Sequence, residues 1–112
     1  MNIILASKSK RRKELLEKIN VKFRIINSNF DESKIKNFDV KPNILCSKLA
    51  FEKANKVSMN YHEDLVIGAD TIVYKNGKIL EKPKNRDEAF SHLRLLSGKT
   101  HEVYTAVHIL NK

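Results

Sequence analysis

Cysteine, glycine, proline and tryptophan are scarce or missing in this chain of 112 residues. The single cysteine, Cys46, excludes an internal disulfide framework and any cysteine-based metal cluster, and its place in a helical pattern predicts a small core residue. Only three glycines and two prolines, together with 41% hydrophobic residues, indicate a folded globular chain and argue against a disordered one. We expect a single domain over residues 1–112.

Long apolar runs and several common enzyme motifs are missing as well. No stretch approaches the roughly 20 apolar residues that span a bilayer, and the short run from Ile3 to Ala6 ends in charge instead of continuing as a secretory signal. We therefore expect no membrane association and a cytoplasmic location. The chain has no P-loop, Rossmann or nucleophile-elbow sequence, and its four histidines lack the spacing of a zinc site.

Acidic residues are outnumbered, 13 against 22 basic ones, so the formal net charge is +9. Such an excess is typical of proteins that bind nucleic acid, because Lys and Arg neutralise phosphates. Here 17 of the basic residues are Lys spread through every segment, and no aromatic residue is interleaved with the one tight cluster, Lys8 to Lys13. A small basic nucleic-acid-binding module therefore stays an alternative function, but the composition argues against nucleic acid as the partner.

The apolar residues alternate between strand and helix spacing along the chain. Strands are predicted at 2–6, 22–26, 65–74 and 100–110, and helices at about 9–19 and 42–58. This order predicts an α/β fold in which a mixed, twisted sheet is flanked by helices.

Two further elements are predicted from local signals in the second half of the chain. An Asn76-Gly77 turn predicts a hairpin that follows the third strand. A third helix is expected to begin at a capping box, Asn85 to Glu88, and to end at Ser97-Gly98. Its predicted buried stripe is Ala89, Leu93 and Leu96.

A strand that runs into a Ser- and Arg-rich turn opens the chain. The hydroxyls of Ser7 and Ser9, with the free N–H groups of the new helix, can bond phosphate oxygens. Arg11 and Arg12 supply charge-assisted partners. The other interpretation is an ordinary helix N-cap followed by a solvated basic face.

Asp70 is a lone carboxylate inside an apolar β run, between Gly68-Ala69 and Thr71-Ile72-Val73. Burying an ionised group without a partner costs several kcal/mol, so we expect a cation, a metal or a ligand beside it. The structural alternative is a turn Asp that bonds its own backbone, which Gly68 allows.

Two other charged features are candidates for the same site. Asp31-Glu32 follows the second strand, and oxygen ligands from this loop together with Asp70 suit Mg²⁺ or Mn²⁺. A solvated acidic pair is the other interpretation of this loop. Lys82 follows the hairpin, which can return its ammonium to the Asp70 end of the sheet, although most Lys side chains face solvent.

Together, ordered segments of the chain resemble the signature blocks of the Maf family of nucleotide pyrophosphatases, also called septum formation inhibitor proteins. The matching segments are Leu5 to Leu16, Phe30 to Glu32, Glu52 to Ala54, Gly68 to Val73, Leu80 to Pro83 and Leu96 to Val107. The resemblance implies an α/β fold with a cleft, similar to that of the inosine triphosphate pyrophosphatases.

The resemblance implies hydrolysis of a nucleoside triphosphate to the monophosphate and pyrophosphate with a divalent metal, Mg²⁺ or Mn²⁺. Asp70 matches the family's catalytic acidic residue, a metal ligand or general base that prepares water for attack on the α-phosphorus, and Glu32 matches the acidic residue that assists at the metal. The residues that match the triphosphate-holding groups are Ser7, Arg11, Arg12, Lys53 and Lys82. Arg11 and Thr71 look like the branch that acts on dTTP and UTP, which places Thr71 in the substrate site.

Two departures from the family pattern affect these expectations. The usual Ser-Pro-Arg-Arg reads Ser9-Lys10-Arg11-Arg12 here, which gives up the preset backbone angle of proline but keeps both Arg. Family members continue well beyond residue 112, so we expect a truncated fold without the family's C-terminal half. An inactive remnant is therefore a further alternative, and exposed sheet edges favour pairing with another chain, as in a homodimer.

Overall fold

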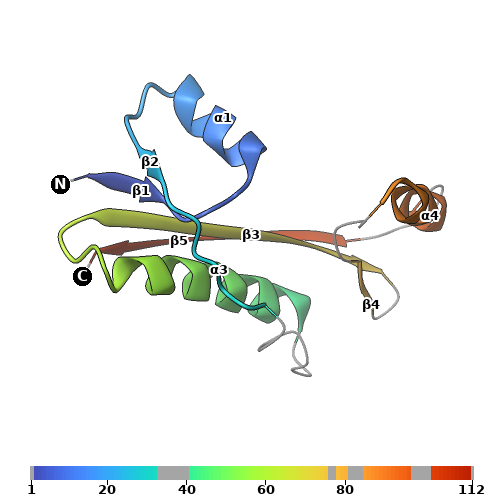
Figure 1. Cartoon of the computed structure of the whole chain (residues 1–112). Helices are drawn as coiled ribbons and strands as arrows, with labels where there is room; N and C mark the ends of the chain where they lie inside the picture. Colours follow the sequence, from blue (N-terminus) through green and yellow to red (C-terminus); the bar gives the residue numbers. More distant parts are fainter. Residues whose placement is uncertain (1, 33–40, 76–77, 81–84, 97–101, 112) are drawn as a thin grey trace.

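The computed structural model describes residues 2–32, 41–75, 78–80, 85–96 and 102–111. The elements follow in the order β1 (Ile3–Leu5), α1 (Lys10–Lys18), β2 (Arg24–Ile25), α3 (Pro42–Ser58), β3 (Leu65–Lys75), β4 (Lys78–Leu80), α4 (Arg86–Leu96) and β5 (Glu102–Asn111). The predicted α/β fold with a mixed sheet is confirmed. Figure 1 shows the long strands β3 and β5 side by side, with α1 and α3 on opposite sides of the sheet.

One edge of β3 is shared by two short strands, and between them the described residues leave part of that edge without a paired strand. β5 runs antiparallel along one edge of β3 from Leu65 to Tyr74. β1 pairs in parallel with residues 65–67, and β4 pairs antiparallel with residues 73–75. Because β5 already occupies one side of these residues, β1 and β4 lie on the other. Within the described ranges no strand pairs with residues 68–72 on that second side, so the edge is open between β1 and β4.

α3 covers one face of the sheet and supplies much of the core. Its bounds agree with the helix predicted at 42–58, with Pro42 in the first turn. Its buried apolar residues are Leu45, Cys46, Leu49, Ala50, Ala54 and Val57. The helix approaches β3 closely at Gly68, where an added Cβ would lie 2.4 Å from the Ala50 carbonyl oxygen and 2.7 Å from Ala54 Cβ.

Side chains of β3 and β5 alternate between the two faces of the sheet. Ile72 and its register partner Tyr104 point toward α3 and pack in its core cluster. The residues that alternate with them along each strand point to the opposite face. On that face of β5, Val103, Val107 and Ile109 are 57%, 58% and 59% exposed.

α4 forms where the capping signal predicts it but does not pack as predicted. The Asn85 side chain accepts a hydrogen bond from the Glu88 backbone N–H at 2.8 Å. Leu93, however, is 66% exposed, so its predicted burial is wrong. Figure 1 shows α4 beyond the far end of β3, apart from α1 and α3. Apolar spacing identifies the apolar face of a helix, whereas the cover for that face comes from the tertiary arrangement.

Other predictions differ at the boundaries of elements. β2 covers only two residues of the strand predicted at 22–26, and it pairs in parallel with β1. The Asn76-Gly77 turn and the helix end at Ser97-Gly98 lie outside the described residues. Among the helices of the described ranges, none combines the length and the apolar composition that crossing a membrane requires.

Candidate active site

Asp70 lies in the middle of β3, on the face that α3 covers. It pairs with Ala106 in the ladder between β3 and β5, so the alternative of a turn Asp is wrong. The Asp70 side chain is only 14% exposed. A carboxylate this buried needs a partner, and α3 supplies it.

Lys53 of α3 lies between two carboxylates that come from distant parts of the chain. Its Nζ donates a hydrogen bond to Asp70 Oδ1 at 3.0 Å and lies 2.6 Å from Glu32 Oε1. Burial alone would lower the pKa of Lys53, but the hydrogen bonds and negative charges of Glu32 and Asp70 outweigh it and raise that pKa above its ordinary value. The sequence predicts a cation, a metal or a ligand beside Asp70, and in the structure the partner is the Lys53 ammonium.

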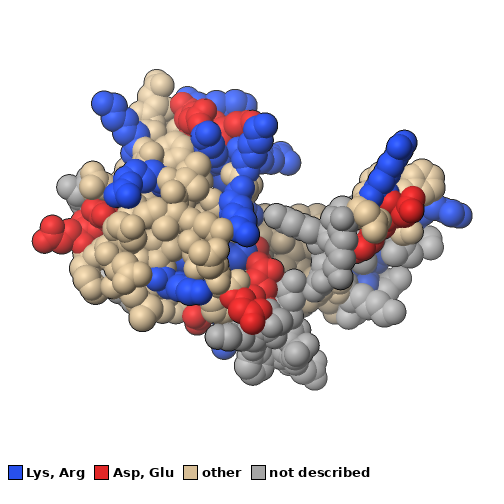
Figure 2. All heavy atoms as spheres, in the orientation of Figure 1, with Lys and Arg blue, Asp and Glu red and all other residues tan. Residues whose placement is uncertain are grey.

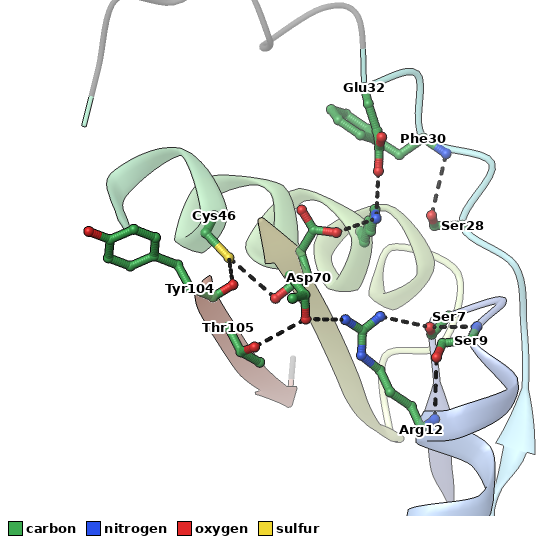
Figure 3. A network of polar contacts seen from close by, with 12 residues as sticks. Ser7, Ser9, Arg12, Ser28, Phe30, Glu32, Cys46, Asp70, Tyr104 and Thr105 are labelled. Atoms are coloured by element: carbon green, nitrogen blue, oxygen red, sulfur yellow. Dashed lines mark hydrogen bonds and ion pairs between the residues drawn. The ribbon is translucent and has the colours of Figure 1, made fainter. Parts of the chain in front are cut away.

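Arg12 joins the first turn of α1 to the other face of β3. Its Nη2 donates to Thr71 Oγ1 at 3.0 Å, and its Nη1 donates to Ser7 Oγ at 3.4 Å. Ser7 Oγ also accepts the Ser9 backbone N–H at 3.0 Å. The guanidinium is thus held at the end of β1 by two hydroxyl oxygens, as Figure 3 shows for Ser7.

Ser9 has a structural role in this turn. It is the N-cap of α1, and its Oγ accepts the Arg12 backbone N–H at 3.3 Å. The N-cap interpretation of the sequence is therefore confirmed for Ser9. Ser7, which is 9% exposed, is the serine of this turn whose hydroxyl accepts from the Arg12 side chain.

Thr105 of β5 belongs to this network, although no motif in the sequence marks it as a site residue. Its Oγ1 lies 3.1 Å from Thr71 Oγ1, and the two residues are direct partners in the β3 and β5 register. The signal that could have found it is a Thr opposite a Thr in an antiparallel pair. That signal appears only after the register of the two strands is known.

The two groups of charges lie on opposite faces of β3. Asp70 and Thr71 are consecutive residues of one strand, so the carboxylates lie on the α3 side and the guanidinium on the α1 side. Figure 3 shows Asp70 directed toward Glu32, with Arg12 reaching the strand from the other side. Both residues belong to the stretch whose edge is open between β1 and β4. A ligand that touches both groups has to pass around this edge.

The oxygen atoms of Asp70 and Glu32 are of the ligand type that a divalent cation such as Mg²⁺ prefers. No three His, Cys, Asp or Glu side chains of the described residues come together as a complete metal cage. The two carboxylates nevertheless direct oxygen atoms at one cationic atom, Lys53 Nζ. Mg²⁺ is commonly held by one or two carboxylates, several waters and substrate phosphates, so two carboxylates satisfy its protein ligands.

Cys46 supports the backbone of Asp70 from within the core. Its Sγ lies 3.3 Å from the carbonyl oxygens of both Asp70 and Tyr104, in position to donate a hydrogen bond to either. Burial first, and the charge of Asp70 second, raise the pKa of the Cys46 thiol. The thiol is therefore neutral and part of the core, as its place in the sequence predicts, with 1% of the residue exposed.

Arg11, Asp31 and Lys82 are the remaining candidate residues. Arg11 is exposed on α1 and takes no part in the network of described residues, and Asp31 is exposed beside Glu32. Lys82 lies outside the described residues. Figure 2 shows basic side chains gathered over α1, together with acidic ones.

Comparison with known protein families places the chain in a family. A family model described as Maf-like protein matches residues 2–112. The chain belongs to the Maf family. The resemblance seen in the ordered sequence segments is thereby confirmed.

Several curated relatives of this Maf chain carry names that state an activity. A dTTP/UTP pyrophosphatase of Clostridium perfringens is 50% identical over 114 residues, which are 99% of this chain and 58% of the relative. A dTTP/UTP pyrophosphatase of Bacillus mycoides is 52% identical over 110 residues, 98% of this chain and 56% of the relative. A nucleoside triphosphate pyrophosphatase of Pelagibacter ubique is 44% identical over 109 residues, 94% of this chain and 56% of the relative. This Maf chain thus spans less than two thirds of the length of these relatives.

Proposed function

We propose that this Maf chain hydrolyses nucleoside triphosphates, dTTP and UTP above all, to the monophosphate and pyrophosphate. The observation that carries the proposal is the convergence of Asp70 and Glu32 on one cationic atom beside the open edge of β3, with the Arg12 guanidinium held on the opposite face. The names of the relatives support the reaction and the choice of substrate. Because nucleoside triphosphates are made and used in the cytoplasm, the proposal also assigns the chain to that compartment.

Asp70 and Glu32 are the residues proposed to hold a divalent cation, Mg²⁺ or Mn²⁺. The cation would neutralise phosphate charge and lower the pKa of a bound water. In the proposed reaction the water oxygen bonds to the α-phosphorus, its proton passes to Asp70, and the bond from the α-phosphorus to the bridging oxygen breaks. Pyrophosphate is the leaving group. Phosphoryl transfer depends mainly on positioning and on charge neutralisation, which this set of residues supplies.

Ser7, Arg12 and Thr71 are proposed to position the triphosphate at the open edge of β3. The guanidinium already bonds Ser7 and Thr71, so its planar fork is oriented before a ligand arrives. Lys82 and Arg11 stay predictions of the family resemblance as further phosphate ligands. The homodimer and the single domain over 1–112 also stay predictions.

Asp70→Asn tests the proposed function. The substitution keeps the shape of the side chain but removes its charge and its capacity to accept a proton, so pyrophosphate release from dTTP or UTP with Mg²⁺ is expected to fall by at least about 10²-fold. The matched control is Asp64→Asn, because Asp64 lies just before β3 and bonds the Asn2 backbone N–H away from the site. Circular dichroism of both variants establishes that they fold.

Three outcomes of this assay are distinct. Turnover that Asp70→Asn abolishes and Asp64→Asn leaves intact supports the proposal. Equal turnover in the wild type and in Asp70→Asn contradicts it. A wild type that shows no turnover but binds DNA in a salt-sensitive manner, with Asp70→Asn unchanged, supports the nucleic-acid-binding alternative instead.

A further inference from the structure

Lys53 occupies the position between the two carboxylates that the proposed function assigns to a divalent cation. Its Nζ is 2.6 Å from Glu32 Oε1 and 3.0 Å from Asp70 Oδ1, so both oxygens already face one positive charge. Mg²⁺ binds carboxylate oxygens at about 2.0–2.1 Å. A cation bound to the same two oxygens therefore lies too close to the ammonium for both to stay, because like charges at that separation repel strongly.

The Lys53 side chain is able to leave this position without any change in the backbone. It extends from the middle of α3 on a flexible four-carbon stem, and its side chain is 18% exposed, so the ammonium has a path toward solvent. Asp70, by contrast, is fixed in the ladder between β3 and β5. The Lys53 ammonium can therefore leave the Asp70 carboxylate while β3 keeps its place in the sheet.

We propose that Lys53 is an exchangeable counter-ion: it pairs with Asp70 and Glu32 in the metal-free chain, and it leaves them when a divalent cation takes their oxygens. The released ammonium is then free to bond the phosphates of the substrate, a last step that rests on the proposed function. Lys53 thereby couples binding of the divalent cation to binding of phosphate. The carboxylates stay paired with Lys53 until the divalent cation binds, and the Lys53 ammonium then becomes available to the phosphates.

Chemical labelling of the wild-type protein tests the exchange directly. Lysine acetylation by a water-soluble ester is followed by mass spectrometry, with and without excess MgCl₂. Labelling of Lys53 is expected to rise several-fold with Mg²⁺, because the amine is no longer held between two carboxylates. Lys56 is the internal control, since it lies on the same helix and its Nζ donates to the Asn29 carbonyl oxygen at 2.8 Å instead of to a carboxylate. Labelling of Lys53 that does not change with Mg²⁺ overturns the proposal.

Metal binding by variants gives a second, independent test. Lys53→Met removes the competing ammonium, so the dissociation constant for Mn²⁺, measured from the free Mn²⁺ signal in electron paramagnetic resonance without nucleotide, is expected to fall by roughly tenfold. Lys56→Met removes the same charge one helical turn away and is expected to leave that constant nearly unchanged. Weaker or equal Mn²⁺ binding in Lys53→Met overturns the exchange, as does a wild type and variant that both fail to bind Mn²⁺.

The two tests do not depend on turnover, so they separate this inference from the proposed function. Exchange without any hydrolysis of dTTP or UTP supports the counter-ion role and contradicts the proposed reaction. Hydrolysis without exchange, with Lys53 equally protected at all Mg²⁺ concentrations, contradicts the counter-ion role alone.

Discussion

Asp70 and Thr71 are neighbours in β3, yet they bond partners on opposite faces of the sheet: Asp70 Oδ1 lies 3.0 Å from Lys53 Nζ, and Thr71 Oγ1 lies 3.0 Å from Arg12 Nη2. A shift of the strand by one residue would exchange the two faces and separate both pairs. The long antiparallel ladder with β5 fixes the register and therefore fixes which charge meets which residue. The site depends on this register more than on any loop.

Arg12→Lys is expected to raise KM for the triphosphate about tenfold, because an ammonium keeps the charge but cannot bond Ser7 and Thr71 with one planar fork. The free energy of unfolding is expected to change by less than about 0.5 kcal/mol, since Arg12 lies outside the core. Steady-state kinetics with dTTP and urea denaturation measure the two effects. Arg11→Lys, the same change at the adjacent exposed residue, is expected to raise KM by less. Equal increases in KM at both positions would contradict the role of the Arg12 bonds to Ser7 and Thr71.

The sequence predicts the scaffold of this site well and its long-range contacts poorly. The bounds of α3 follow from Pro42 and the spacing of its apolar residues, and the position of Asp70 inside a strand follows from the apolar run around it. Both signals are local. The contact of Glu32 with Lys53 joins a loop to a helix, and no local periodicity predicts it. Lys53 is assigned to the site only by the family resemblance.

The failures have the same physical cause. Leu93 carries the helical spacing of a buried residue, but its burial requires another element to lie over it, and spacing does not encode that element. Thr105 carries no special signal in its own strand, and its role depends on facing Thr71 across the ladder. Contacts between residues that are far apart in the sequence cannot be predicted until the register of the strands is known.

Ser9→Ala is expected to cost about 1 kcal/mol of stability, because the Arg12 backbone N–H loses its side-chain acceptor at the first turn of α1. Ser9→Asn should restore that stability, since Asn is an equally good N-cap. Urea denaturation of the three proteins measures the effect. Full stability of Ser9→Ala would show that the capping bond contributes nothing, and a failure of Asn to rescue would assign the loss to another contact.

Gly68→Ala is expected to destabilise the fold by about 3 kcal/mol. The new Cβ would lie 2.4 Å from the Ala50 carbonyl oxygen, and a helix backbone cannot retreat as a flexible side chain can. Moving α3 away from β3 also moves Lys53 away from Asp70. Thermal unfolding measures the loss of stability, and an unchanged midpoint would mean that α3 does not pack this closely on β3.

Lys53 is expected to make stability depend on alkaline pH. Its pKa is raised from the ordinary value of 10.5 by Glu32 and Asp70, so these ion pairs stabilise the folded state fully below about pH 10 and lose their contribution as the pH rises through the raised pKa.

Lys53→Met isolates this contribution from that of the other lysines. At about pH 8 the variant should be less stable than the wild type by about 1 kcal/mol, because two carboxylates are left without their ammonium. The gap should narrow as the pH is raised above about 10.5, where the wild-type side chain also loses its charge. Urea denaturation across this pH range measures the gap, with Lys56→Met as the comparison because Lys56 donates to a neutral carbonyl. A difference in stability between the wild type and Lys53→Met that stays constant with pH would mean that the charge of Lys53 does not stabilise the fold.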